Sequence, residues 1–316
     1  MNKKVVVLGG GTGLSVLLKG LKQFPIDITA IVSVSDDGRS TGRLREEFSI
    51  PAVGDIRQVI VALSETEPLV EKLLNYRFKT TSDLNGHTVG NLLLTAASNI
   101  TGNVSDGVET LSKVLNLKGK VCPLTEDNVT LMGRMEDDSI VEGEHNITLC
   151  DKKIKEVFYK ENPKVNPMAL EAIKNADLIL LSMGSVYTSI VPNLICQAVI
   201  DAIDESDAKI MYVCNMMTQP GETDDLSASQ HIDLLNSYLG NKKISSVLVN
   251  NKNIPKKIKE KYIVEEQKDQ VIIDFDKLMD IKVIASNFYT LENNMIRHDS
   301  LKLGLSIFSY LLSEKA

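Results

Sequence analysis

Residues 3–13 read Lys-Lys-Val-Val-Val-Leu-Gly-Gly-Gly-Thr-Gly, and this stretch decides the fold. The apolar run Val5–Leu8 is rich in β-branched residues, which is typical of a strand buried on both faces of a parallel sheet. An apolar stripe at positions 14, 17, 18 and 21 then predicts a helix. A strand, a glycine turn and a helix N-terminus together form an anion site, because the first N–H groups of the helix have no partner within it. We therefore expect an α/β fold with an anion-binding loop at Gly9–Gly13.

This glycine loop differs from the two common phosphate-binding motifs. The P-loop ends in Gly-Lys-Ser/Thr, but the first lysine after the glycines is Lys19. The dinucleotide fingerprint requires a third glycine where Leu14 or Val16 stands. The sequence thus predicts an anion site but does not name a nucleotide. A tight turn without any ligand stays open as the alternative.

Composition narrows the class of protein. The chain has 316 residues, is 43% hydrophobic and 24% charged, and carries a net charge of −7, which argues against nucleic-acid binding. We expect a cytoplasmic protein without membrane insertion, because the N-terminus runs into a strand and no apolar run reaches about 18 residues. The four cysteines show no Cys-x-x-Cys spacing, so a zinc site is not expected.

Acidic residues follow the second expected strand, residues 28–34. Asp36 and Asp37 stand where a dinucleotide fold binds a ribose hydroxyl, and two adjacent carboxylates also suit Mg²⁺. An Asp-Gly turn without a ligand is the alternative reading. Asp55 falls in the first turn of a helix that opens at residues 51–55, where it is a cap and a candidate metal or hydroxyl partner.

Two further polar segments come next in the chain. Residues 39–45 contain three arginines and are expected to form a loop that contacts phosphate or is simply solvated. His87 and Asn91 open a helix between flanking glycines, where they can contact a phosphate and a base or sugar edge. A structural histidine is the alternative.

The second half of the chain returns to strands that end in polar loops. Residues 177–181 and 209–214 are expected strands, and Ser185 and Asn215 lie in the loops that follow them. Because ligands of open α/β sheets lie beyond the carboxyl ends of the strands, these loops predict a shared crevice. Residues 117–160 read instead as an antiparallel β-rich excursion, and Arg297 and His298 precede a last helix.

Six motifs together resemble one known family. They are Gly9-Gly-Gly-Thr-Gly-Leu-Ser, Ser33-Val-Ser-Asp-Asp-Gly, Gly54-Asp-Ile-Arg, Gly86-His-x-x-Gly-Asn, Gly184-Ser-x-Tyr-Thr-Ser and Met217-Thr-Gln-Pro-Gly-Glu-Thr. In this order they resemble the YvcK-type gluconeogenesis factors, which are relatives of CofD, the 2-phospho-L-lactate transferase. The resemblance spans essentially the whole chain. It implies a single doubly wound, Rossmann-like α/β domain over residues 1–316, in which residues 250–316 close over the crevice.

The resemblance also implies a function and a set of contacts. It implies a protein that binds UDP-sugars such as UDP-N-acetylglucosamine and supports cell shape and wall synthesis during gluconeogenic growth, as a homo-oligomer or with a cell-wall-synthesis partner. No cofactor would be required, and Mg²⁺ is the candidate metal, held by Asp37 and Asp55. By this resemblance, phosphate contacts would fall on Gly10, Gly11, Thr12 and Gly13, and further ligand contacts on Asn91, Tyr187, Asn215 and Arg297. The polar segments described above add Asp36, Asp37, His87 and Ser185 as expected ligand contacts.

Two functional classes therefore compete at this stage. The leading hypothesis is a regulatory protein that binds a nucleotide sugar without turnover, since no nucleophile or acid/base pair can be assigned from spacing. The alternative is a CofD-type, Mg²⁺-dependent transferase that moves a phospholactyl-like group, because such chemistry relies on positioning and electrostatics rather than on a reactive side chain.

Overall fold

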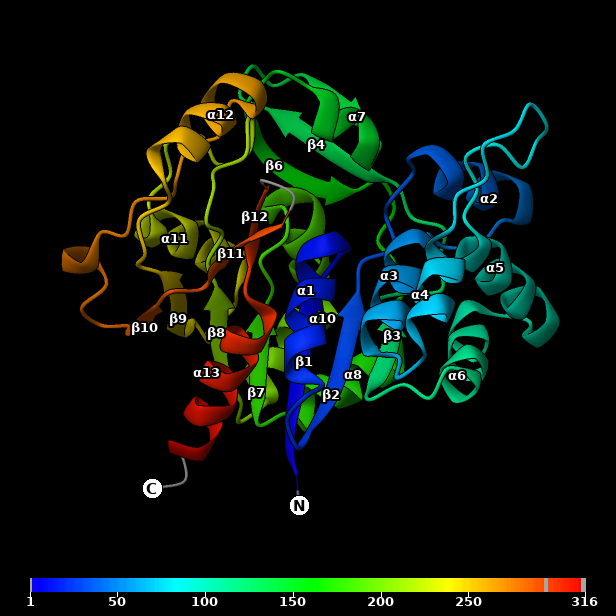
Figure 1. Cartoon of the computed structure of the whole chain (residues 1–316), viewed down its shortest axis with the longest axis horizontal. Helices are drawn as coiled ribbons and strands as arrows, with labels where there is room; N and C mark the ends of the chain where they lie inside the picture. The colour runs from blue at the N-terminus through cyan, green and yellow to red at the C-terminus, as the bar shows by residue number, and fades with distance from the viewer. Residues whose placement is uncertain (1, 293–294, 314–316) are drawn as a thin grey trace.

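The computed structural model describes residues 2–292 and 295–313, apart from the side chain of Arg39. Its centre is a seven-stranded sheet in the order β10-β9-β8-β7-β1-β2-β3, and all neighbouring strands are parallel (Figure 1). The chain winds outward from β1 in one direction and then outward from β7 in the other, so the predicted doubly wound α/β fold is confirmed. The strands are β1 (Lys3–Gly9), β2 (Ile26–Val32), β3 (Lys120–Pro123), β7 (Leu178–Leu181), β8 (Lys209–Val213), β9 (Ile244–Asn250) and β10 (Lys282–Ser286).

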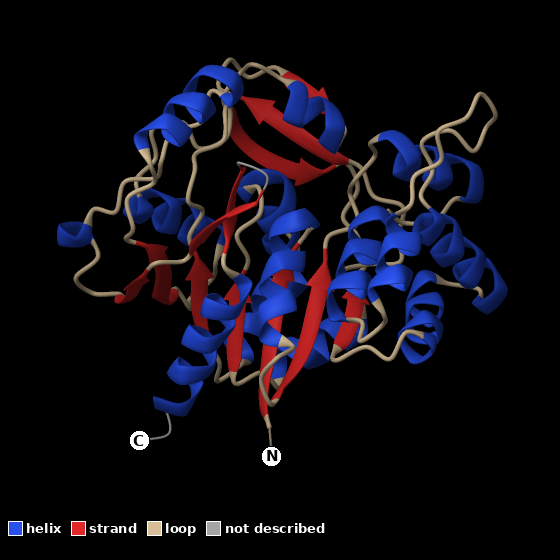
Figure 2. Cartoon of the chain, viewed as in Figure 1, coloured by secondary structure: helices blue, strands red, loops and turns tan. Residues whose placement is uncertain are grey.

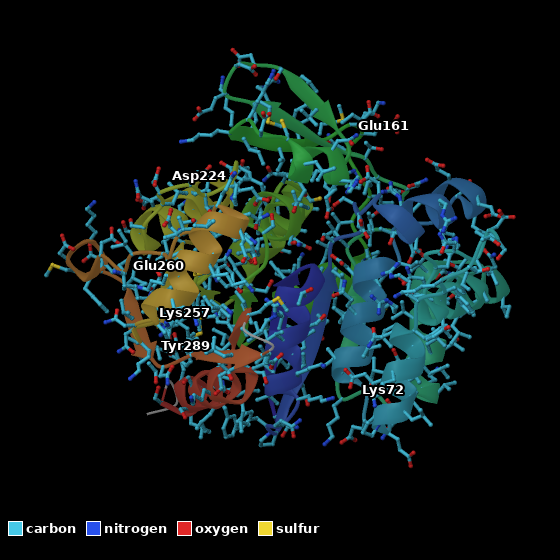
Figure 3. The ribbon with its side chains drawn as sticks, turned by 45° about the horizontal axis from the view of Figure 1, so that its top comes forward. Lys72, Glu161, Asp224, Lys257, Glu260 and Tyr289 are labelled. Atoms are coloured by element: carbon cyan, nitrogen blue, oxygen red, sulfur yellow. The ribbon has the colours of Figure 1, made fainter. Side chains whose placement is uncertain are left out.

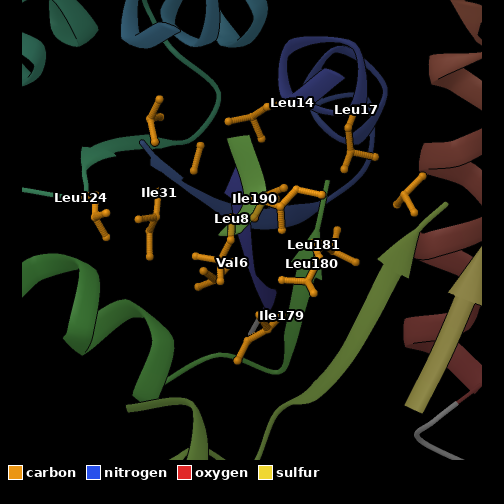
Figure 4. Close-up of a cluster of buried hydrophobic side chains, with 14 of the residues drawn as sticks. Val6, Leu8, Leu14, Leu17, Ile31, Leu124, Ile179, Leu180, Leu181 and Ile190 are labelled. Carbon is orange, nitrogen blue, oxygen red and sulfur yellow. The ribbon is translucent and has the colours of Figure 1, made fainter. Parts of the chain in front are cut away.

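The core lies along β1 and its two neighbours. Leu8 pairs with Ile31 of β2 on one side and with Leu181 of β7 on the other, and all three side chains are fully buried. Figure 4 shows Leu14 and Leu17 of the following helix above this strand cluster. The central position of β1 explains its continuous apolar run, because both faces of the strand are covered by helices.

Helices cover both faces of the sheet (Figure 2). On one face α1 (Gly11–Leu21) packs between α3 (Gly54–Leu63) and α13 (Ser300–Ser313), and on the other α8 (Pro167–Lys174) packs on α10 (Gln197–Glu205). Asp299 caps α13 through the Lys302 amide at 3.1 Å, as its sequence position predicts. The remaining helical segments are α2 (Arg39–Phe48), α4 (Pro68–Asn75), α5 (Val89–Thr101), α6 (Val104–Val114), α7 (Glu144–Leu149), the π-helix η1 (Val186–Ile190), α9 (Val191–Leu194), α11 (Ala228–Tyr238), α12 (Lys256–Glu266) and the 3-10 turn η2 (Phe275–Lys277).

Two small antiparallel sheets stand outside the parallel sheet. One has the order β5-β4-β6, from β4 (Leu131–Met135), β5 (Ile140–Glu142) and β6 (Ile154–Tyr159), and forms the lobe at the top of Figure 1. The other is the hairpin β11 (Tyr289–Glu292) and β12 (Met295–His298). The antiparallel excursion thus begins later than expected from residues 117–160, because β3 pairs in parallel with β2 and forms the edge of the main sheet.

The arginine-rich segment expected as a loop at residues 39–45 is helical. Leu44 is buried in the core, and the guanidinium of Arg45 donates to the carbonyls of Ser35 and Asp36 at 3.0 and 3.1 Å. Arg45 therefore ties α2 to the loop that precedes it and is not available to a phosphate. The run fits a helix better than a loop because Leu44 and Arg45 both face the protein interior.

Both described ends of the chain lie at the edge of the sheet where the parallel strands begin, opposite the glycine loop (Figure 1). The four cysteines are free thiols, as their spacing predicts. Among residues 2–292 and 295–313, no single helix is both long and apolar enough to cross a membrane. The pair Val186–Leu194 and Gln197–Glu205, bent by 68°, meets the length and composition criteria only jointly.

Candidate functional site

A cleft of about 410 Å³ lies at the carboxyl ends of β1, β7 and β8, where the direction of winding changes. Its floor is the first turn of α1, its walls are the loops after β7 and β8, and α12 and the hairpin β11–β12 form its outer side. Figure 3 shows Lys257 and Glu260 of α12 on the same side of the molecule as Tyr289 of β11, away from Lys72 of α4. The cleft is lined by residues including Gly10, Thr12, Gly13, Met183, Ser185, Asn215, Gln219, Tyr262, Lys268, Met295 and Arg297.

Glycines let the floor of the cleft pack directly on its neighbours. A Cβ atom added to Gly13 would lie 2.1 Å from the carbonyl oxygen of Met183, and one added to Gly10 would lie 2.6 Å from the Ser33 hydroxyl. At Gly13 the obstacle is backbone, which cannot rotate away as a side chain can. The first turn of α1 and the loop after β7 are therefore in direct contact, and this contact sets the distance between floor and wall.

One amide of the glycine loop is already bonded inside the protein. Gly11, with φ +62°, donates its N–H to Oδ2 of Asp55 at 2.6 Å, and Gln58 donates to the other oxygen at 3.3 Å. Desolvation and then the neighbouring charge of Asp36 raise the pKa of Asp55 to about 7. Thr12 and Gly13, the next residues of the first helical turn, carry the N–H groups that remain for an anion.

The wall after β7 is built by a π-helix that begins at Ser185. The Ser185 hydroxyl accepts hydrogen bonds from the amide and the hydroxyl of Thr188, at 3.0 and 2.8 Å. Asn215, from the loop after β8, donates its side-chain amide to the carbonyl of Gly184 at 2.9 Å. The two walls are thus bonded to each other, and π-helical turns are often found at functional sites.

The outer side of the cleft is held by a separate apolar cluster of Met216, Ile254, Tyr262 and Ile296. The Tyr262 hydroxyl accepts the amide of Ile296 at 2.8 Å and so joins α12 to β12. This cluster fixes the backbone directly before Arg297, which lines the cleft.

Two cationic side chains, Arg297 and Lys268, line the same cleft as the first turn of α1. Arg297 donates to the neighbouring Ile296 carbonyl at 3.2 Å, and no carboxylate of the described chain forms an ion pair with it. Lys268 pairs with Glu266 at 2.8 Å near the same rim. A helix N-terminus on one side and a guanidinium on the other form an arrangement that can hold phosphate oxygens from both sides.

The chain matches a known family over most of its length. The sequence profile described as "2-phospho-L-lactate transferase CofD" matches residues 5–289. The chain belongs to the CofD family. Within this family it resembles proteins named "Gluconeogenesis factor": one from Bacillus subtilis (strain 168) is 46% identical over 98% of both chains, and one from Halalkalibacterium halodurans is 46% identical over 96% of this chain and 95% of the relative. A crystal structure of a Bacillus halodurans protein matches this CofD-family fold with a TM-score of 0.93 at 45% identity, covering 98% of this chain and 100% of the other.

The structure of this CofD-family protein brings together half of the predicted contact residues. Gly10, Thr12, Gly13, Ser185, Asn215 and Arg297 all line the cleft, although they come from four separate parts of the chain. Tyr187 does not line it, because its side chain is buried in the main core and its amide points at Glu222, 3.3 Å away.

His87 and Asn91 form a second, buried polar cluster with Ser40 of α2. The Ser40 hydroxyl lies 2.9 Å from Nδ1 of His87 and accepts from the Asn91 amide at 3.2 Å. Neither residue lines the cleft, and their predicted ligand contacts remain predictions.

The acidic residues gather between the N-terminus of α1 and the start of α7. Asp36 is the carboxylate whose charge acts on Asp55, whereas Asp37 accepts the amide of His145 at 2.8 Å. Burial raises the pKa of Glu144 well above its ordinary value, and its carboxylate accepts the Ser35 hydroxyl at 2.7 Å. Glu144 was not singled out from the sequence, because its helix α7 meets this loop only through tertiary packing.

A Mg²⁺ ion fits this acidic group only together with a ligand. In the part of the chain that the structure describes, no three His, Cys, Asp or Glu side chains are grouped as a metal would need. Mg²⁺ is commonly bound by one or two carboxylates, water and substrate phosphates, and Asp36 and Asp55 can supply that pair beside the glycine loop. When bound, the ion would neutralise charge on a phosphate. The assignment of Asp37 as a ligand remains a prediction.

The free energy of unfolding should depend on pH because the carboxyl group of Asp55 is buried. Because its folded pKa is about 7 and its ordinary value is 3.8, the folded protein holds a proton that the unfolded chain releases between these values. The free energy of unfolding should therefore fall as pH rises from about 4 to 7. Asp55→Asn keeps an acceptor for Gly11 but carries no charge, so we expect it to be about 2 to 4 kcal/mol more stable than the wild type at pH 8 and similar at pH 4. Urea unfolding at both pH values measures this; an equal difference at both would show that Asp55 does not titrate in this range.

Proposed function

We propose that this protein binds a nucleotide sugar, with UDP-N-acetylglucosamine as the leading candidate, and does so without turning it over. The observation that carries the proposal is the pairing of the α1 N-terminus with Arg297 and Lys268 across one cleft. Free helical N–H groups and a guanidinium fork are the two protein groups best suited to a diphosphate. The cleft volume of about 410 Å³ is within the range of small-molecule sites.

The remaining lining residues support a ligand with one apolar and one polar end. Met216, Met217 and Tyr262 offer an apolar surface for a base, and the side chains of Ser185, Asn215 and Gln219 offer hydrogen bonds to sugar hydroxyls. His298, the cleft's histidine, is bonded to the Cys214 carbonyl at 3.3 Å, and burial lowers its pKa to about 4. An imidazole with a pKa of about 4 is a weak general base at neutral pH, which supports binding rather than turnover.

Two further proposals rest on the family. The relatives' name, gluconeogenesis factor, supports a cytoplasmic role in growth on gluconeogenic carbon sources. There we propose that the liganded protein, as a homo-oligomer or with a cell-wall-synthesis partner, maintains cell shape. The competing proposal is a CofD-type transferase, which the Asp36–Asp55 pair beside the glycine loop would serve by holding Mg²⁺.

A thermal-shift experiment with product analysis separates these proposals. UDP-N-acetylglucosamine at about 100 times its Kd should stabilise the folded protein by about 2.7 kcal/mol, with or without Mg²⁺. Chromatography of the same samples should recover the ligand intact. Mg²⁺-dependent consumption would favour the transferase, and the absence of any shift with UDP or UDP-sugars would reject nucleotide-sugar binding.

A further inference from the structure

Glu222 lies directly behind the cleft, in the loop after β8, and only 9% of it is exposed. One carboxylate oxygen accepts the hydroxyl of Ser185 at 2.5 Å, and the other accepts the side-chain amide of Gln219 at 2.5 Å. The amides of Val186 and Tyr187, at the start of the π-helix, also donate to this carboxylate. Glu222 therefore joins the two walls of the cleft, because Ser185 belongs to one and Gln219 to the other.

The loop that carries Glu222 is itself fixed. The amides of Glu222 and Thr223 donate to the carbonyl of Gln219 at 3.0 and 2.9 Å, and Gln219 donates its amide to the Thr223 hydroxyl at 2.9 Å. Gly221 has φ +76°, a backbone conformation that residues with a side chain rarely adopt, and its amide donates to the Asp224 carboxylate at 2.8 Å. The carboxylate is thus held on a rigid turn and acts on both walls from a fixed position.

Only the ionised carboxylate matches its surroundings. Its four partners are all donors, and two ionised oxygens have four acceptor positions. A protonated Glu222 would need an acceptor for its own hydrogen. The nearest is the Ser185 oxygen, which already accepts both hydrogen bonds from Thr188. Protonation would therefore break one bond of this network and release Ser185 or the start of the π-helix.

We propose that Glu222 is a positioning residue of the cleft, whose carboxylate sets the affinity for a diphosphate-containing ligand by holding Ser185 and Gln219 in place. The proposal rests on the proposed function, since it concerns the same cleft. It gives a role to the late Met-Thr-Gln-Pro-Gly-Glu-Thr motif, in which Gln219 reaches the cleft and Glu222 does not.

The proposal implies a pH-dependent affinity. Burial raises the pKa of Glu222 to about 7, so the carboxyl gains its proton as pH falls through neutrality. Tyr187 faces it from the π-helix, and the charges of Glu222 and Glu136 act on its phenol. Burial, and then these two charges, raise the pKa of Tyr187 to about 12, so it stays neutral across this range. Asp224 lies in the same turn through its bond to Gly221. Asp55, which is bonded to Gly11, and Glu144 also have raised pKa values. The Asp55→Asn background removes the first, and the comparison with Glu222→Gln separates both from the titration of Glu222.

The test is calorimetric binding of UDP-N-acetylglucosamine, and of UDP alone, at pH 6 and pH 8. In the Asp55→Asn background, the protein should bind about fivefold more weakly at pH 6 than at pH 8. Loss of one hydrogen bond to a charged group costs about tenfold in affinity, and a carboxyl with a pKa of about 7 is still about one-tenth ionised at pH 6. Glu222→Gln has the same shape but places an amide donor among donors, so it mimics the protonated acid. It should bind about tenfold more weakly at pH 8 and lose most of the pH dependence.

Controls keep the result specific to Glu222. Glu171→Gln, the same change on exposed α8, should keep wild-type affinity and pH profile. If Glu222→Gln does not fold, the Ser185→Ala variant takes its place in the test. Ser185→Ala removes one of the four donors to the Glu222 carboxylate and should reduce both the affinity and its pH dependence. The proposal would be overturned if Glu222→Gln, or Ser185→Ala when used in its place, showed wild-type affinity and wild-type pH dependence. A wild-type protein that binds neither probe would instead reject the nucleotide-sugar site, and the role of Glu222 with it.

Discussion

Gly13→Ala should remove ligand binding and destabilise the fold at the same time. The added Cβ would lie 2.1 Å from the Met183 carbonyl oxygen and 2.6 Å from its carbon, so either α1 or the loop after β7 must move. That loop is held, since the amide of Ser182 donates to the carbonyl of Leu8 at 3.1 Å. Overpacking of this kind costs about 1 to 3 kcal/mol, which exceeds the gain of up to about 1 kcal/mol from replacing a helical glycine by alanine. Urea unfolding and calorimetry with UDP-N-acetylglucosamine measure the two effects.

A matched control lies at the other end of the same helix. A Cβ on Gly20 would lie 1.8 Å from the carbonyl oxygen of Ser300, a clash similar to that at Gly13 but remote from the cleft. Gly20→Ala should therefore lose comparable stability while keeping its affinity for the ligand. If Gly13→Ala kept both its stability and its affinity, the contact between α1 and the loop after β7 would not be essential to the cleft.

Arg297→Ala should weaken the binding of UDP-N-acetylglucosamine by about 10- to 100-fold, the loss expected for hydrogen bonds to a charged group. The melting temperature without ligand should hardly change, because Arg297 bonds only to the adjacent Ile296 carbonyl and the Met295 sulfur within the described chain. Arg297→Lys keeps the charge but loses the planar fork, so its affinity for the ligand should lie between that of the wild type and that of Arg297→Ala. If melting and affinity fell together in Arg297→Ala, the residue would be structural rather than a ligand contact.

The parts of the fold that follow from local sequence were predictable. The run Val5–Leu8, the glycines and the leucine stripe of α1 each predicted their own element, and together they place the glycine turn at the carboxyl end of β1, where the cleft lies. The order of the strands in the sheet could not be predicted from local sequence patterns. The position of β7 beside β1, which creates the cleft, depends on side-chain packing between segments about 170 residues apart.

The residues missed by sequence reasoning share one physical cause. Tyr262 and Lys268 lie in or just after α12, whose first residues, 256–261, form a basic run of the kind usually found on solvated surfaces. Only one side of that segment meets the cleft, and its weak apolar pattern gives no sign of which side. Glu222 was quoted only as part of a motif, because a buried carboxylate is recognisable by its donors and these come from another loop. Arg297 was named from its place before the last helix, with a crevice contact and a plain surface position both left open, and then from the resemblance.

The placement of the two described chain ends has a practical consequence. Both lie at the edge of the sheet where the parallel strands begin, and the cleft lies at the opposite edge (Figure 1). A fluorescent protein or an affinity handle fused at either end would therefore project away from the entrance used by a small molecule. The same geometry suits immobilisation on a sensor surface, with the ligand-binding face directed toward the flowing solution.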